Sequence, residues 1–208
     1  MEVVFVKRRT GVRTAISPLF VFVTVVFPVI TGKRWVFLFA LAAMLHEFGH
    51  LAALWLLGAR MERLSLRLSG AEIGYRGERL SYGGEALLAL AGPGMNLLCA
   101  CLCAVFARFW PQPGLHRFIG CHLTLALFNL LPALPLDGGR VLKTLLESRW
   151  PLAGEKITRM ISGGVGLVLV LLGLHILQIN RNPTLLAAGA VILLKSDVKT
   201  LYTSRKNC

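Results

Sequence analysis

The segment His46-Glu47-Phe48-Gly49-His50 places two imidazoles and a carboxylate close together in the chain. On a helix, residues four apart lie on one face, so His46 and His50 can ligate the same metal ion. Zinc suits such ligands, and it lowers the pKa of a water in its open fourth position to about 7. Glu47 is placed to accept a proton from that water. The pattern therefore predicts one catalytic zinc ion per chain, with Glu47 as general base.

The apolar surroundings of this motif strengthen the prediction. Between Trp35 and Gly58 the only ionisable residues are His46, Glu47 and His50. An acidic side chain near the middle of a membrane helix costs about 2.5–3.5 kcal/mol on insertion scales. The alternative is a structural Glu paired with a buried His. A catalytic metal site accounts better for three such residues in one apolar segment.

A zinc ion held by two histidines needs a further protein ligand, and Asp137 is the candidate. Pro132 and Pro135 interrupt regular helix pairing just before it, and Gly138 and Gly139 follow it and permit unusual backbone angles. Irregular backbone at membrane depth is tolerated where it lines a cavity or is buried in protein. The sequence thus offers Asp137 on a bent segment beside a polar pocket. A helix cap or an interfacial turn is the alternative role for this residue.

The composition of the whole chain indicates a membrane protein. Hydrophobic residues make up 55% of the 208 residues and charged residues only 16%, against about 25% charged in an ordinary soluble domain. The net charge of +13 is spread in short clusters between apolar runs rather than along one stripe. This arrangement predicts contact with a lipid bilayer and no nucleic-acid partner.

The apolar runs and the charges between them predict a membrane topology. Six runs stand out, the last of them short: Thr14–Ile30, Trp35–Gly58, Ala86–Phe109, Phe118–Leu134, Ile161–Ile179 and Thr184–Leu194. Alternate segments between them carry eighteen Lys and Arg residues on one side and five on the other. We therefore expect an all-α polytopic protein of about six transmembrane helices in the cell membrane, with both termini cytoplasmic.

A short strand pair is expected after the second apolar run. Leu64, Leu66 and Leu68 alternate with polar residues, and Ala71–Tyr75 is a suitable partner strand. This predicts a small β-hairpin at the cytoplasmic edge of the membrane. A strand at a sheet edge can pair with an added chain, so these three leucines are candidates for holding an extended substrate segment. A packed hairpin with a covered edge is the alternative.

Three segments together resemble the site-2 protease family of intramembrane zinc metalloproteases. They are the His46–His50 helix, Ala91-Gly92-Pro93-Gly94-Met95-Asn96, and the run from Asn129 to Gly139. The specific part is Leu-Pro-x-x-Pro-Leu-Asp-Gly-Gly, whose Asp lies 87 residues after His50. The resemblance covers nearly all of the chain. It is strongest to the sporulation type that processes a precursor sigma factor (stage IV sporulation protein FB).

The resemblance implies specific roles and a specific reaction. Asp137 would join His46 and His50 as zinc ligand, while Asn129 and Pro135 match positions that shape the substrate site. The expected reaction is peptide hydrolysis by attack of a zinc-bound water. The expected substrate is a membrane-associated protein, such as a sigma-factor precursor in sporulation, and an inhibitory or regulatory membrane protein is an expected partner.

One domain over residues 1–208 is expected, without the PDZ or CBS domain that other members of the family carry. A membrane metal transporter is one alternative, although it would repeat ionisable residues in several spans. A catalytically inactive zinc-binding relative is another, and the intact Glu47 argues against it. A different zinc protease class would take Glu147 or Glu155 as third ligand. The remaining histidines are expected to be packed or interface residues: His116, His122 and His175.

Overall fold

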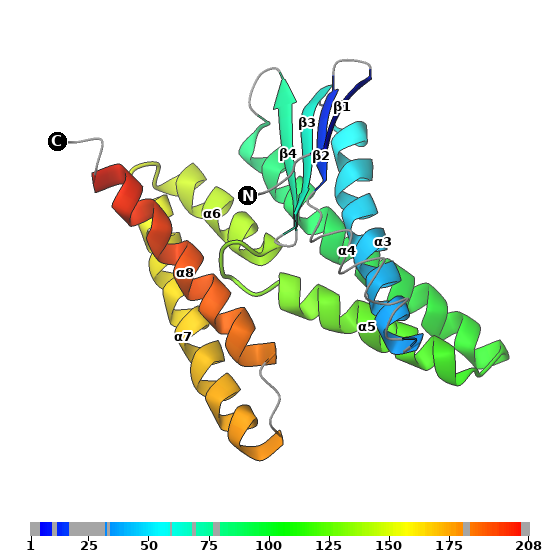
Figure 1. Cartoon of the computed structure of the whole chain (residues 1–208). Helices are drawn as coiled ribbons and strands as arrows, with labels where there is room; N and C mark the ends of the chain where they lie inside the picture. Colours follow the sequence, from blue (N-terminus) through cyan, green and yellow to red (C-terminus); the bar gives the residue numbers. More distant parts are fainter. Residues whose placement is uncertain are drawn as a thin grey trace. The chain divides into compact units, whose positions relative to one another are not determined.

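The computed structural model describes residues 5–9, 12–16, 32, 34–58, 60–67, 70–76, 80–180 and 184–204. The chain divides into two compact units, residues 1–127 and residues 128–208. Figure 1 shows the elements, which run in this order: β1 (Phe5–Arg9), β2 (Val12–Ile16), α3 (Arg34–Leu56), β3 (Arg60–Arg67), β4 (Gly70–Arg76), α4 (Tyr82–Phe109), α5 (Pro113–Asn129), α6 (Asp137–Arg149), α7 (Gly154–Asn180) and α8 (Thr184–Ser204).

The first unit contains a four-stranded sheet in the order β1-β2-β3-β4 (Figure 1). The outer pairs β1–β2 and β3–β4 are antiparallel, and β2–β3 is parallel. The antiparallel pair of β3 and β4 lies where the sequence predicts a hairpin, with Leu64 opposite Ile73. A sheet of this size was not expected from the sequence, because β2 reaches β3 from a distant part of the chain.

This sheet corrects two predictions. The first expected span, Thr14–Ile30, begins inside β2, and its residues 17–30 lie outside the described part of the chain. The second correction concerns the substrate-binding role of the leucines in β3. Leu64 and Leu66 pair with β2 on one side and with β4 on the other, so neither lies at an open edge. Leu68 falls outside the described residues.

The helices α3 and α4 pack closely through small residues. A Cβ atom added to Gly49 on α3 would lie 2.5 Å from the carbonyl oxygen of Ala91 and 2.8 Å from Cβ of Met95 on α4. Ala53, Leu54 and Leu88 form a buried apolar cluster between the same two helices. Small residues that allow such close backbone approach are typical of helix pairs in membranes.

Within the described residues, three helices are long and apolar enough to cross a membrane: Arg34–Leu56, Tyr82–Phe109 and Gly154–Ile179. The six expected spans are therefore not supported. The fourth expected span ends early, because α5 stops at Asn129, and the sixth forms the shorter apolar helix Thr184–Leu194 at the start of α8. The proline-containing residues 130–136 do not continue α5.

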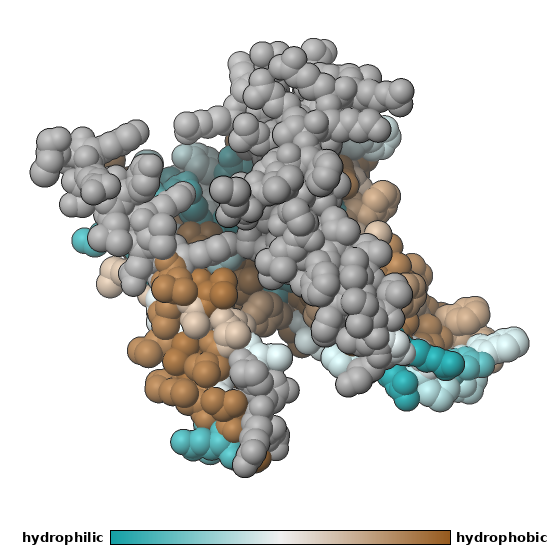
Figure 2. All heavy atoms as spheres, in the orientation of Figure 1, coloured by the Kyte–Doolittle hydropathy of each residue, from teal (hydrophilic) through white to brown (hydrophobic). Residues whose placement is uncertain are grey.

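The surfaces of the three long helices suit lipid. Phe37 on α3, Leu102 on α4 and Leu171 on α7 are 59%, 61% and 58% exposed. Figure 2 shows apolar atoms along the sides of the long helices on the visible face, with hydrophilic residues gathered at helix ends. Contiguous exposed apolar surface of this kind marks an interaction site, and acyl chains are the partner that fits long apolar helices.

The second unit consists of α6, α7 and α8 with the loop that precedes α6. The helices α7 and α8 approach closely at glycines: a Cβ on Gly189 would lie 2.7 Å from the backbone nitrogen of Val170, and one on Gly166 would lie 3.0 Å from Ile192. The loop of residues 130–136 leads directly into α6, whose first residue is Asp137. This loop contains a cis peptide bond between Leu134 and Pro135.

Candidate metal centre

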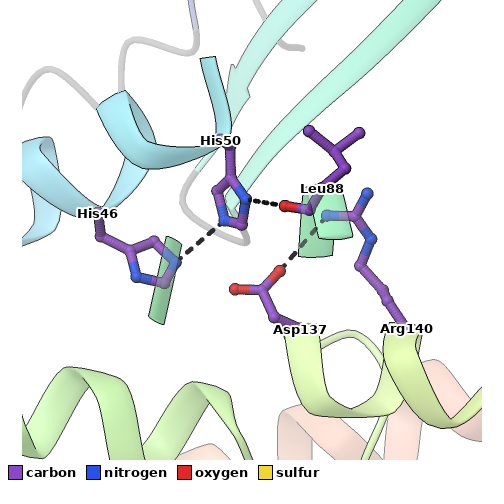
Figure 3. A network of polar contacts seen from close by, with 5 residues as sticks. All are labelled: His46, His50, Leu88, Asp137 and Arg140. Carbon is purple, nitrogen blue, oxygen red and sulfur yellow. Dashed lines mark hydrogen bonds and ion pairs between the residues drawn. The ribbon is translucent and has the colours of Figure 1, made fainter. Parts of the chain in front are cut away.

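The two histidines of the His-Glu-x-x-His segment converge on one point. His46 and His50 are 6% and 5% exposed, and their Nε2 atoms lie 3.2 Å apart (Figure 3). The ring planes are nearly perpendicular, at 84°. Two nitrogens at the usual Zn–N distance on a tetrahedral ion would be roughly 3.4 Å apart. The spacing of the two Nε2 atoms thus matches that of two ligands of one zinc ion.

The outer nitrogen of His50 is held by the main chain of α4. Its Nδ1–H donates to the carbonyl oxygen of Leu88 at 2.8 Å (Figure 3). In the neutral imidazole, a proton on Nδ1 leaves the lone pair on Nε2, the nitrogen that faces His46. Metal-binding histidines are commonly oriented in this way by a carbonyl on their other ring nitrogen.

The outer nitrogen of His46 faces Asn96, and Asn96 in turn contacts His122. Nδ2 of Asn96 lies 3.1 Å from Nδ1 of His46, and Nδ1 of His122 lies 2.9 Å from Oδ1 of Asn96. Both Asn96 and His122 are fully buried. The sequence analysis assigned His122 to packing and gave Asn96 no role. The available signals were that Asn96 ends one of the three segments that carry the family resemblance and that both residues are polar within apolar runs.

Gly92 on α4 leaves room beside the two imidazoles. A Cβ atom at this position would lie 2.7 Å from Nε2 of His46 and would overlap Nε2 of His50. A glycine is therefore required here if a third atom is to approach both nitrogens. Two converging Nε2 atoms and a space kept free of side chain fit a metal ion such as zinc.

Glu47 lies next to His46 on α3 and is half-buried. Neighbouring residues on a helix diverge by about 100° around its axis. The Glu47 carboxylate therefore cannot be a third ligand on the same face as both histidines. A neighbouring position suits a group that exchanges protons with a molecule held at the metal.

In the second unit, Asp137 opens α6 and is 6% exposed. Leu136 occupies the N-cap position, so the helix-cap role considered for Asp137 is not what the structure shows. Arg140, one turn later, lies with Nη1 3.4 Å from Oδ1 of Asp137 (Figure 3). A negative charge in the first turn also interacts favourably with the helix dipole.

The loop before Asp137 packs tightly onto the first turn of α6. A Cβ on Gly138 would overlap the carbonyl oxygen of Leu130, and one on Gly139 would overlap the backbone of Ala133 and Leu134. The Gly-Gly pair that follows Asp137 is thus needed for close backbone approach. Asn129 at the end of α5 and Pro135 in the loop are both half-buried, and their substrate-binding role stays a prediction.

Comparison with known proteins shows what this chain is similar to. Residues 114–173 match the family model described as peptidase family M50. The chain is 29% identical over 149 residues to a zinc metalloprotease of Methanocaldococcus jannaschii, covering 67% of this chain and 43% of that protein. It is 30% identical over 175 residues to a putative zinc metalloprotease of a Synechocystis species, covering 76% of this chain and 45% of that protein.

A solved structure has a similar fold. The site-2 protease from Methanocaldococcus jannaschii superposes with a TM-score of 0.68 at 22% identity, over 95% of this chain and 94% of that one. The chain spans less than half the length of the two curated relatives.

Proposed function

We propose that this chain is a zinc endopeptidase that cleaves a membrane-associated protein within or beside the bilayer. The observation that carries the proposal is the pair of buried Nε2 atoms of His46 and His50, 3.2 Å apart in an apolar helix. Two buried imidazoles at this spacing provide two of the protein ligands that a catalytic zinc ion requires. The match of residues 114–173 to the peptidase family M50 model and the similarity to zinc metalloproteases favour hydrolysis over metal transport.

Asp137 is proposed as the third protein ligand. Catalytic zinc sites of this type use two histidines and a carboxylate with one position open. Asp137 is buried like His46 and His50, and the three side chains together offer two nitrogens and a carboxylate oxygen. The glycines after Asp137 and the ordered loop before it hold its backbone in place, as a ligand contributed from a distant segment requires.

Different residues of the chain have separate roles in the proposed hydrolysis. A bound zinc ion would supply Lewis acidity, which polarises the scissile carbonyl and makes a nearby water acidic. Glu47 accepts a proton from the attacking water on its carboxylate and then donates it to the nitrogen of the leaving amine. The Leu88 carbonyl keeps Nδ1 of His50 protonated, and Gly92 keeps the space beside both imidazoles open.

A multi-pass membrane location with both termini cytoplasmic is proposed as the setting. The three long apolar helices and their exposed apolar side chains support the membrane location. The uneven distribution of Lys and Arg between the apolar runs supports the orientation. Peptide bonds in a transmembrane helix are hydrogen-bonded internally, so cleavage needs a locally extended substrate segment.

The edge strand β4 is proposed to bind that extended segment. In the sheet order β1-β2-β3-β4, β4 pairs with β3 on one side only among the described strands. An added strand would take its hydrogen bonds from the open side of β4. Asn129 and Pro135 are proposed to contact the substrate nearer to the scissile bond. A sigma-factor precursor in sporulation is a candidate substrate, and co-expression with such precursors would test it.

The substitution Glu47→Gln tests the proposed reaction. Purified wild-type protein should contain about one zinc per chain, measured by elemental analysis. Glu47→Gln should keep this zinc, because the ligands are intact, and should lower the cleavage rate by about 10²–10⁴-fold, because the general base is lost. His46→Ala should lose both zinc and activity. Normal cleavage by Glu47→Gln would refute the mechanism.

A further inference from the structure

A continuous series of hydrogen bonds runs through the metal centre in the first unit. Nδ1–H of His122 donates to Oδ1 of Asn96 at 2.9 Å, and Nδ2–H of Asn96 donates to Nδ1 of His46 at 3.1 Å. Since Nδ1 of His46 accepts, its proton lies on Nε2, which faces Nε2 of His50 at 3.2 Å. The series ends where Nδ1–H of His50 donates to Leu88. Each donor faces an acceptor.

With these tautomers only His50 presents a lone pair to a metal ion, so His46 must change its tautomer when a metal ion binds. A ligating imidazole needs a lone pair on the nitrogen that faces the metal, so the proton of His46 must lie on Nδ1. Nδ1–H of His46 would then meet the N–H₂ group of Asn96, and two donors would face each other. A half-turn of the Asn96 amide about χ2 exchanges Oδ1 with Nδ2 and places an acceptor toward His46.

The half-turn of the Asn96 amide also changes the tautomer that His122 must adopt. With its amide turned, Asn96 presents N–H to Nδ1 of His122, so this nitrogen must accept and the proton of His122 must lie on Nε2. We propose that Asn96 and His122 are positioning residues that fix the tautomer of His46, and that their hydrogen bonds reverse direction when His46 binds metal. His122 acts on His46 only through Asn96. This proposal rests on the zinc site proposed above.

The surroundings of the two residues support a coupled pair. Asn96 and His122 are both 0% exposed, so bulk water does not compete for the amide. The ring of Phe118, one turn earlier on α5, packs edge-to-face on His122 with ring centroids 4.4 Å apart. Nε2 of His122 has no hydrogen-bond partner among the described residues. Moving the proton of His122 from Nδ1 to Nε2 therefore breaks no hydrogen bond at Nε2.

A double-mutant cycle separates this role from simple packing. Zinc affinity is measured by chelator competition for wild type, Asn96→Leu, His122→Phe and the double variant. Asn96→Leu should weaken zinc binding about 10–100-fold, and His122→Phe should weaken it on the order of 10-fold. In the Asn96→Leu background, His122→Phe should have no further effect. Independent losses that multiply in the double variant would overturn the proposal.

Two further variants sharpen this comparison. His116→Phe makes the same substitution on the exposed side of α5 and should leave zinc affinity unchanged. Asn96→Asp places an acceptor toward both imidazoles and should retain most of the wild-type zinc affinity, as carboxylates do when they orient metal-binding histidines. A loss in Asn96→Asp as large as in Asn96→Leu would contradict a role in setting the tautomer.

A spectroscopic test needs no substitution in the metal centre. Nitrogen-15 NMR of histidine-labelled protein reports which ring nitrogen carries each proton, and His116→Gln and His175→Gln variants identify the other signals. His122 should carry its proton on Nδ1 without zinc and on Nε2 with zinc. An unchanged His122 tautomer in protein that binds zinc would refute the proposed pair alone. Failure of wild-type protein to bind zinc would refute the proposed function, and the pair with it.

Discussion

The backbone N–H of Leu134 donates to Oγ of Ser162 at 2.9 Å, and the same hydroxyl donates to the carbonyl oxygen of Thr158 at 2.7 Å. Ser162 and Thr158 lie on α7 and are fully buried. A single side chain therefore joins α7 to the loop that ends at Asp137. This loop cannot use helix or sheet hydrogen bonds, so the hydroxyl supplies a partner that its backbone otherwise lacks.

Replacing this hydroxyl should loosen the Asp137 loop. Ser162→Ala leaves the partly buried N–H of Leu134 without its partner, which should cost on the order of 1 kcal/mol of stability. Thermal unfolding in detergent checks this value. The matched control is Ser148→Ala: Ser148 is exposed and donates to Leu145 within its own helix, so removing it should change stability by about 0.5 kcal/mol or less. Equal effects of both substitutions would contradict the role given to Ser162.

Two glycines on α4 give a matched test of the space beside the histidines. Gly92→Ala should abolish zinc binding, because its Cβ would occupy the position next to Nε2 of His46 and His50. Gly94→Ala adds the same atom where nothing lies within 4 Å, so zinc content should stay at the wild-type level. Both changes favour a helix by up to about 1 kcal/mol, so helix weakening cannot explain a loss. Zinc content by elemental analysis decides between these outcomes.

Asp137→Asn tests the third ligand. The amide keeps the shape of the side chain but is a poor zinc ligand, so zinc affinity should fall at least 10-fold while the protein stays folded. Asn and Asp are similar in helix-terminal roles, so a purely structural residue would tolerate the change. Chelator competition measures the affinity and thermal unfolding checks the fold. If this variant binds zinc with wild-type affinity, Asp137 is not a zinc ligand.

Proline substitutions in β4 test strand addition. Of the adjacent residues Glu72 and Ile73, one N–H faces β3 and the other faces the open edge, because successive amides alternate along a strand. Proline removes one donor. At the edge-facing position, proline should leave zinc content and thermal stability near wild type and lower cleavage more than alanine does. If both folded proline variants cleave normally, the substrate does not pair with β4.

The local features of this protein follow from its sequence. His46 and His50 share a helix face because their spacing of four residues matches the helical repeat. The strand pair β3–β4 follows from alternating leucines near a turn. The irregular segment before Asp137 follows from its prolines, and the family resemblance adds the proposed role of Asp137 as a ligand. These features depend on neighbours close in the chain, which is why sequence pattern predicts them.

Contacts between distant segments were decided by the tertiary structure. The parallel pairing of β2 with β3 covers the side of Leu64 and Leu66 that β4 leaves open, and no pattern within β3 indicates it. An apolar run likewise does not reveal that α5 stops at Asn129. Asn96 and His122 are 26 residues apart and meet only because α4 and α5 pack together. A polar side chain in an apolar run shows that a partner is needed, whereas packing decides which residue that partner is.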